Sequence, residues 1–222
     1  MIKTHETSLK IKLKKVLTVA NVQAQKVVRI EFTGTWFAAF KKPQDRGLWF
    51  VWGGSGSGKS TFLMMLAKAF ALLGFKVLYN LLEEEVDDSD YIDRTEMCGM
   101  NEVAGMFDTA SYNFEELDYY LNKRTTKARV IVIDSATYLT RDFEKVKALV
   151  KKYKEKIFIF SGHAEGKNPR TEFEKSIKYH SKMKIFVSGY LAMCKGRTIG
   201  ANGGRFMIWR EGYDKINGTS LN

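Results

Sequence analysis

A glycine-rich segment between two apolar stretches constrains the fold of this 222-residue chain more than any other feature. Residues 53–60 read GGSGSGKS and fit the pattern G-x-x-x-x-G-K-[ST] in full. The apolar run over residues 48–52 predicts a buried strand. Residues 59–73, which are apolar on most faces, predict a helix that ends near Gly74. The chain is therefore expected to fold around a strand–loop–helix unit.

The residue types of this loop suit the binding of phosphate. Glycines let successive backbone N–H groups curl around an anion, and a helix N-terminus adds partial positive charge. Lys59 would reach the β- and γ-phosphates of a nucleotide, and the Ser60 hydroxyl would coordinate Mg²⁺. A flexible linker would need neither Lys-Ser at these positions nor flanking elements. We predict a phosphate-binding loop made of Gly53, Gly54, Ser55, Gly56, Ser57, Gly58, Lys59 and Ser60.

Three further polar residues follow predicted strands. Asp134 ends the apolar run 130–133, stands 75 residues after Lys59, and is expected to hold Mg²⁺ with Ser60. Glu83 follows the strand predicted at 76–82, where a carboxylate can polarise an attacking water. The neighbouring Glu84 and Glu85 are better explained as the acidic start of a helix. His163 follows the strand predicted at 157–160, and contact with a γ-phosphate and simple solvation are equal alternatives for it.

Strands alternate with helices along most of the chain, which predicts an α/β fold with a mostly parallel sheet covered on both faces. Helices are expected at 87–98, 114–124 and 143–153, with a short strand at 103–107. The segment 161–163 is expected to form a turn. Further strands are expected at 185–187 and 206–209, and alternation also favours strands at 9–14 and 26–32.

Charge is distributed unevenly. The chain has 36 Lys and Arg against 25 Asp and Glu, for a net charge of +11. Residues 83–118 alone carry −12, so the remainder totals +23. Solvated helix faces account for part of this excess, as in 145–156, but positive segments brought together would make a polyanion-binding face. The acidic segment is expected to face away from that surface.

Composition and the lack of recognisable targeting signals argue against several classes of protein. With 45% hydrophobic residues the chain can bury a core, which argues against disorder. Two cysteines cannot build a disulfide framework or a four-ligand zinc site. No segment is apolar and long enough to span a bilayer, and the first residues lack an export signal. A cytoplasmic location, bacterial or host, is expected.

The order of these motifs resembles the RecA-like ATPase core of RecA/RadA recombinases and DnaB-type helicases. Several details are similar to RadA: 77–79 followed by Glu83 and Glu84, then Gly162-His163 followed by Gly166 and Pro169. Lys195-Gly196-Arg197 followed by 203–206 also resembles its Lys-x-Arg segment and the next strand. The resemblance covers about residues 47–210 and implies a three-layer P-loop core with extra C-terminal antiparallel strands. The chain looks like a minimal core, similar to the short RecA-like ATPases of phages and mobile elements.

The resemblance also implies roles for individual residues. Thr61 would join the loop in binding ATP, Glu83 would be the catalytic glutamate, and His163 would be the γ-phosphate sensor. Lys195 and Arg197 would act as fingers on a neighbouring subunit's ATP, which implies a ring or filament. The loops 164–175 and 198–205 would contact single-stranded DNA through Lys167, Arg170, Lys175 and Arg205.

Residues 1–46 match nothing in the RadA pattern, and we expect a basic extension there that serves docking or oligomerisation, with residues 47–222 as the core. The leading hypothesis is a Mg²⁺-dependent ATPase that assembles on single-stranded DNA in recombination or replication. The alternative is an ATP-dependent switch that recruits a partner such as a transposase or helicase. A small-molecule or nucleoside kinase is a third hypothesis, and it is less favoured because the sequence shows no obvious Arg-rich lid.

Overall fold

A nine-stranded sheet forms the centre of the molecule in a computed structural model, which describes residues 13–200 and 202–218. The strand order is β3-β2-β4-β5-β1-β7-β8-β9, and the short β6 pairs with β5 alone. All strands from β3 to β7 in this order are parallel, while β8 and β9 are antiparallel additions at one edge. The strands are β1 Gly47–Gly53, β2 Val77–Leu81, β3 Phe107–Ala110, β4 Val130–Asp134, β5 Ile157–Glu165, β6 Asn168–Pro169, β7 Met183–Ser188, β8 Leu191–Gly196 and β9 Gly204–Met207.

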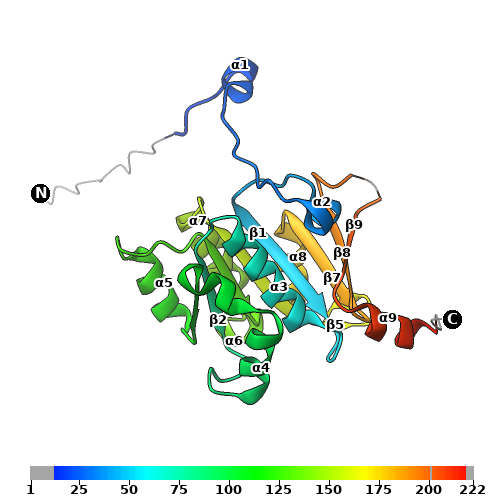
Figure 1. The fold of residues 1–222 in the computed structure, drawn as a ribbon. Helices are drawn as coiled ribbons and strands as arrows, with labels where there is room; N and C mark the ends of the chain where they lie inside the picture. The colour runs from blue at the N-terminus through cyan, green and yellow to red at the C-terminus, as the bar shows by residue number, and fades with distance from the viewer. Residues whose placement is uncertain (1–12, 201, 219–222) are drawn as a thin grey trace, which may run out of the picture.

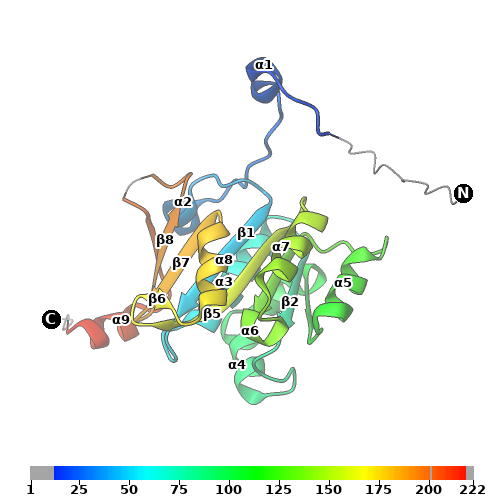
Figure 2. The ribbon, with the colours of Figure 1, turned by 180° about the vertical axis from the view of Figure 1, so that it is seen from behind.

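Helices cover both faces of the sheet. Figure 1 shows α3 and α2 in front of the strands, and Figure 2, seen from behind, shows α5, α6, α7 and α8 on the opposite face. Beyond these layers, α1 stands apart and α9 follows β9. The helices are α1 Val19–Gln23, α2 Gly34–Phe40, α3 Lys59–Leu72, α4 Ser89–Met97, the 3₁₀ helix η1 Met100–Met106, α5 Phe114–Asn122, α6 Ala136–Leu139, α7 Phe143–Lys152, α8 Glu172–His180 and α9 Arg210–Asn217.

Strand β1 contributes to two separate hydrophobic cores, because successive side chains of a strand point to opposite faces. Trp49 and Val51 belong to the core beneath α2 and α3. Phe50 and Trp52 belong to the core beneath α5, α7 and α8. A strand buried on both faces explains why residues 48–52 are apolar without alternation. The fold is a three-layer RecA-like P-loop core with extra antiparallel strands, as the resemblance implied.

Most elements expected from the sequence are present at shifted bounds, three expectations need correction, and a fourth lies mostly outside the described residues. Residues 100–106 form the helix η1, and the strand begins only at Phe107. Residues 161–163 form no turn, because β5 continues to Glu165. Within 26–32 the structure has a single bridge between Arg29 and Gln44 rather than a strand. Of the strand expected at 9–14, residues 9–12 lie outside the described part, and residues 13 and 14 have no regular structure.

The N-terminal segment has two parts. Ile30, Phe32 and Phe40 are buried in the core with β1 and α3, and Trp36 stacks on Phe206 of β9 at 3.9 Å between ring centroids. Residues 13–28 instead stand away from the body, as both views show, and α1 buries none of its residues. The domain boundary at residue 46 stays a prediction, but residues 30–46 share the core of the main body.

Within the described residues, no helix combines the length and the apolar character needed to cross a membrane.

Candidate nucleotide-binding site

The glycine-rich loop joins the end of β1 to the first residue of α3, Lys59. Gly56 and Gly58 have φ values of +68° and +91°, a region that side chains disfavour. A Cβ on Gly58 would lie 2.8 Å from the Tyr190 ring, and one on Gly53 would lie 2.6 Å from the Val187 carbonyl oxygen. Close neighbours therefore exclude a side chain at Gly53, and at Gly58 the backbone shape disfavours one as well.

A cavity of about 480 Å³ opens above this loop. It lies at the carboxyl ends of β1, β2, β4 and β5, where ligands bind in open α/β sheets. Its walls join the predicted residues to others that sequence reasoning did not single out. The lining residues are Gly54, Ser55, Gly56, Ser57, Gly58, Lys59, Ser60, Thr61, Glu83, Glu84, Asp90, Arg94, Asp134, His163 and Tyr190.

The Lys59 ammonium lies between two carboxylates. Its Nζ is 3.9 Å from Glu83 Oε2 and 3.9 Å from Asp134 Oδ1, and its side chain is only 8% exposed. Both contacts are longer than a hydrogen bond, so the amine keeps donor capacity for an anion in the cavity. A buried lysine at a helix N-terminus beside a glycine cradle fits a phosphate group well.

Asp134 is held rigidly. Its Oδ1 accepts a hydrogen bond from Ser161 Oγ at 2.5 Å, and its Oδ2 accepts one from Tyr79 OH at 2.8 Å. Burial, reinforced by the Asp134 charge and the hydrogen bond to it, raises the pKa of Tyr79 well above its ordinary value. Tyr79 therefore stays a neutral donor that fixes the carboxylate.

Glu83 and His163, predicted from separate strands, come together. His163 Nε2 lies 3.5 Å from Glu83 Oε1, and the other carboxylate oxygen faces Lys59. The His163 backbone N–H donates to the buried Glu174 of α8, which also caps that helix. No sequence pattern indicates this role for Glu174, because a glutamate at helix position N3 is common.

Arg94 of α4 also faces the cavity and was missed. Its guanidinium donates two hydrogen bonds, of 2.8 and 2.9 Å, to the Glu84 carboxylate. Burial alone would lower the pKa of Arg94, but pairing with Glu84 raises it above its ordinary value. Arg94 is the one basic residue within 83–118, and this position among acidic residues is the sequence feature that could have pointed to it.

Tyr190, the other missed residue, closes the loop from the side of β7 and β8. Its backbone N–H donates to the Ser57 carbonyl oxygen at 3.0 Å, and its φ of +60° turns the ring onto Gly58. Tyr190 and Thr61 line both this cavity and a larger apolar groove along α3. The Gly189-Tyr190 turn carries no motif that would have revealed this position.

The donor set suits Mg²⁺ better than a metal held by protein ligands alone. No group of three or more His, Cys, Asp or Glu side chains within 13–200 and 202–218 is arranged to hold a metal ion. The predicted metal residues Ser60 and Asp134 line the same cavity as the glycine loop. Mg²⁺ usually takes one or two protein oxygens and completes its shell with phosphate and water.

The expected finger residues lie away from this cavity. Lys195 of β8 pairs with Lys184 of β7, which is level with Phe50 of β1, and Arg197 follows the end of β8. The loop begins three residues beyond Phe50, at Gly53. Lys195 and Arg197 thus lie toward the opposite end of the sheet, and neither lines the cavity of its own chain.

The residues expected to contact DNA are exposed but do not belong to two simple loops. Lys167 lies in the turn between β5 and β6, Arg170 follows β6, Lys175 is on α8, and Arg205 is on β9. Residues 164–175 therefore form a hairpin and the start of a helix, which corrects the expected loop. Arg170 N–H donates to the His163 carbonyl oxygen at 3.0 Å.

Comparison with known proteins identifies the fold alone. No protein-family model matches the chain, and no curated protein sequence matches it. Among the solved structures that resemble it is flagellar accessory protein FlaH from Methanocaldococcus jannaschii. The two are 16% identical, with a TM-score of 0.57 over 81% of this chain and 93% of FlaH. This likeness and the sheet order together establish a RecA-like core.

Proposed function

We propose that this protein is a P-loop ATPase of the RecA-like type. The observation that carries the proposal is the buried Lys59 ammonium, which lies 3.9 Å from both Glu83 and Asp134 at the mouth of a complete glycine loop. A cation, a candidate base and a candidate metal ligand meet where the loop would hold a triphosphate.

Each residue has a role in hydrolysis that follows from its position. The loop N–H groups and Lys59 bind the β- and γ-phosphates and balance the charge that develops during transfer. Glu83 orients a water and accepts its proton as the water oxygen attacks the γ-phosphorus and the bond to the β–γ bridging oxygen breaks. His163, beside Glu83, donates a hydrogen bond to the γ-phosphate. Mg²⁺ held by Ser60 and Asp134 would neutralise phosphate charge when bound.

We further propose that the protein binds single-stranded DNA. His163 lines the nucleotide cavity and also a second cavity that contains Arg141 and Arg170. A movement of His163 on loss of the γ-phosphate would therefore also alter the second cavity and its cationic side chains. Lys167 and Arg205 would extend that surface, and Lys175, which pairs with Glu172, would contribute less. A role in the recombination or replication of a phage or mobile element is part of this proposal.

Assembly into a ring or filament is the third part of the proposal. Lys195 and Arg197 lie away from their own cavity, so any role for them at a triphosphate requires a neighbouring copy. Head-to-tail contacts between copies would supply that arrangement.

The test is phosphate release from ATP by the wild type and three variants. Lys59→Ala should abolish hydrolysis and weaken nucleotide binding. Glu83→Gln should reduce turnover by about 100-fold while binding persists, because the amide cannot accept the proton. Glu85→Gln is the matched control, since Glu85 is exposed and does not line the cavity. Equal turnover in Glu83→Gln and the wild type would overturn the catalytic assignment.

Single-stranded DNA separates this proposal from the switch alternative. We expect DNA to raise turnover and ATP to raise DNA affinity. Slow turnover that DNA does not change, together with DNA affinity that ATP does not change, would instead favour a switch that recruits a protein partner.

A further inference from the structure

The segment of residues 13–28, here called the arm, exposes an unusual amount of apolar surface. Leu13 and Val16 are 86% and 91% exposed, and five more large apolar side chains are exposed along it. Figures 1 and 2 show the arm and α1 standing away from the body from both sides. Apolar surface of this kind marks an interaction site, because its exposure to water is unfavourable.

The apolar residues of the arm follow the period of a helix. Seven of them recur mainly with spacings of three and four residues, which places these seven on one stripe of a continuous helix, while Val19 and Val22 lie off it. The stripe consists of Leu13, Val16, Leu17, Ala20, Ala24, Val27 and Val28. Only α1, five residues long, is helical in the free chain, and a short helix is marginal in water without a partner. The arm therefore has the sequence of an amphipathic helix that lacks its binding surface.

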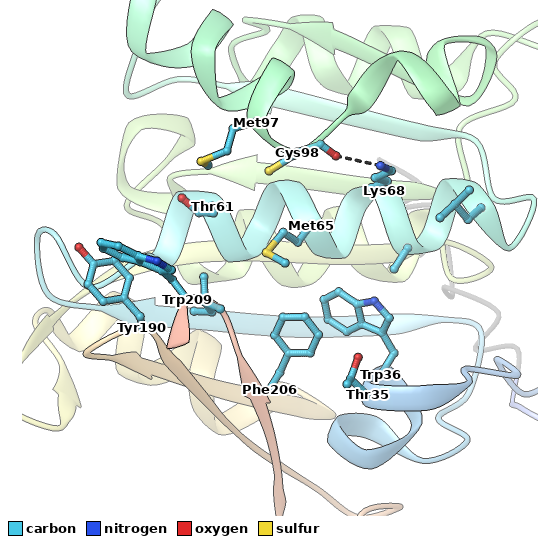
Figure 3. Close-up of a pocket in the computed structure, with 13 residues that line it drawn as sticks. Thr35, Trp36, Thr61, Met65, Lys68, Met97, Cys98, Tyr190, Phe206 and Trp209 are labelled. Atoms are coloured by element: carbon cyan, nitrogen blue, oxygen red, sulfur yellow. Dashed lines mark hydrogen bonds between the residues drawn. The ribbon is translucent and has the colours of Figure 1, made fainter. Parts of the chain in front are cut away.

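The body of the molecule offers a matching groove of about 720 Å³. Figure 3 shows it running along α3, with Met97 and Cys98 on one side and Trp36 and Phe206 on the other. Leu72, Met97 and Trp209 are exposed in its walls. From Thr61 to Leu72 it follows twelve residues of helix, or about 16 Å from the first to the last, which a helix of similar length from the arm would fill.

The charges of the arm and of the groove are also complementary. Residues 13–28 contain Lys14, Lys15 and Lys26 and no acidic residue. On the groove side, α4 carries Asp93 and Glu96 before Met97, and Glu102 pairs with the groove residue Lys68. A basic amphipathic helix would thus meet an apolar floor with an acidic rim, which favours this docking over nucleic acid as the arm's partner.

We propose that the arm of one copy docks as an amphipathic helix in the groove along α3 of a second copy, an inference that rests on the assembly proposed above but not on ATP hydrolysis. The arm extends away from the body in the free chain, and no described segment of the same chain covers the groove. Such a contact joins two different surfaces, so it repeats from copy to copy and builds a ring or filament. Thr61 and Tyr190, shared by groove and nucleotide cavity, place the docked arm beside the ATP site.

The test is sedimentation of the full-length protein without nucleotide, so its outcome does not depend on hydrolysis. Val16→Asp on the stripe and Met97→Lys in the groove should each leave a monomer under conditions in which the wild type assembles. Two controls match them: Val22→Asp on the opposite face of the arm, and Ile92→Lys, also exposed on α4 but outside the groove. Both controls should assemble like the wild type, and thermal melting checks that all variants fold.

Mixing the two assembly-defective variants gives the decisive result. The intact groove of Val16→Asp should accept the intact arm of Met97→Lys, and the chain cannot grow further, so a heterodimer is expected. Continued assembly of Val16→Asp, monomers in the mixture, or a monomeric wild type would each overturn the proposal. A monomeric wild type would indicate that the arm folds back on its own groove or serves another partner.

Discussion

Three consecutive glutamates after β2 have three different environments. The Glu83 carboxylate lies between Lys59 and His163, the Glu84 carboxylate is bound by Arg94, and Glu85 is exposed. The difference comes from the position of each side chain relative to α4 and β5. At the scale of single residues, chemistry is thus assigned by neighbours that lie far away in the sequence.

Arg94 should matter for nucleotide binding because it neutralises Glu84. We expect Arg94→Ala to weaken ATP binding by about tenfold, since an unpaired carboxylate would then face the phosphates. Isothermal titration with ATP measures the effect. The double variant Arg94→Ala with Glu84→Gln should recover most of the loss, and a double variant as weak as the single one would show that Arg94 contacts the nucleotide directly.

Cys194 of β8 should make stability fall at alkaline pH. Burial raises the pKa of Cys194 from 9.0 to about 12, so the folded state keeps the thiol proton longer than the unfolded state. The stabilisation of the folded state by the protonated Cys194 thiol is complete below pH 9 and is lost between pH 9 and about 12. Between pH 9 and 10 the free energy of unfolding should fall by about 1 kcal/mol more in the wild type than in Cys194→Ala.

Denaturant titrations at pH 8, 9 and 10 measure this difference. The cavity left by the alanine lowers stability equally at each pH, so it cancels. Parallel pH curves for the two proteins would contradict the prediction.

At the scale of elements, the helix α2 is attached to the sheet through β9. Trp36 stacks on Phe206, and Gly204 lies so close to α2 that a Cβ there would meet the Ala39 backbone at 2.0 Å. The helix α2, which comes from the N-terminal part of the chain, therefore packs against the antiparallel edge strand β9 near the C-terminus. This contact also forms one wall of the groove along α3.

Gly204→Ala should separate α2 from β9. Because the obstructing atoms belong to the backbone, we expect a loss of about 3 kcal/mol in the free energy of unfolding. Gly105→Ala in η1 is the control, since a Cβ there would meet nothing within 4 Å. Chemical denaturation of both variants measures the effect, and equal stabilities would show that α2 can shift without cost.

At the scale of the whole molecule, the net charge of +11 conceals a division between surfaces. The acidic segment 83–118 contains α4, η1, β3 and the start of α5, and β3 is the edge strand of the sheet next to β2. Lys167, Arg170 and Arg205 lie on the other side of β4, on or beside β5, β6 and β9. The strand order therefore separates the acidic region from the proposed DNA-binding residues.

The affinity for single-stranded DNA should fall steeply with salt if these cations contact phosphates. Each contact contributes about 0.7 to the slope of log affinity against log salt, so Arg170→Ala should reduce the slope by about that amount. Lys147→Ala is the control, because Lys147 is on α7 and pairs with Glu144. Fluorescence anisotropy at several salt concentrations gives the slopes, and equal slopes for Arg170→Ala and the wild type would remove Arg170 from the interface.

The sequence by itself identified the glycine-rich loop, the carboxylates Glu83 and Asp134 that line the cavity above it, and the alternation of strands and helices that makes the sheet parallel. These are local features: a glycine pattern, an apolar run and the polar residue that ends it. The sequence also assigned most central strands and helices, since burial on both faces leaves an uninterrupted apolar run.

Only the tertiary structure decided which side chains meet. Arg94, Glu174 and Tyr190 reach the site from α4, α8 and the turn after β7, and no spacing rule predicts such contacts. The predictions of a strand at 26–32 and of a turn at 161–163 were wrong, because the pairing of a strand and the length of β5 depend on neighbouring strands. The groove along α3 likewise exists only because α2, α4 and β9, distant in sequence, pack around one helix.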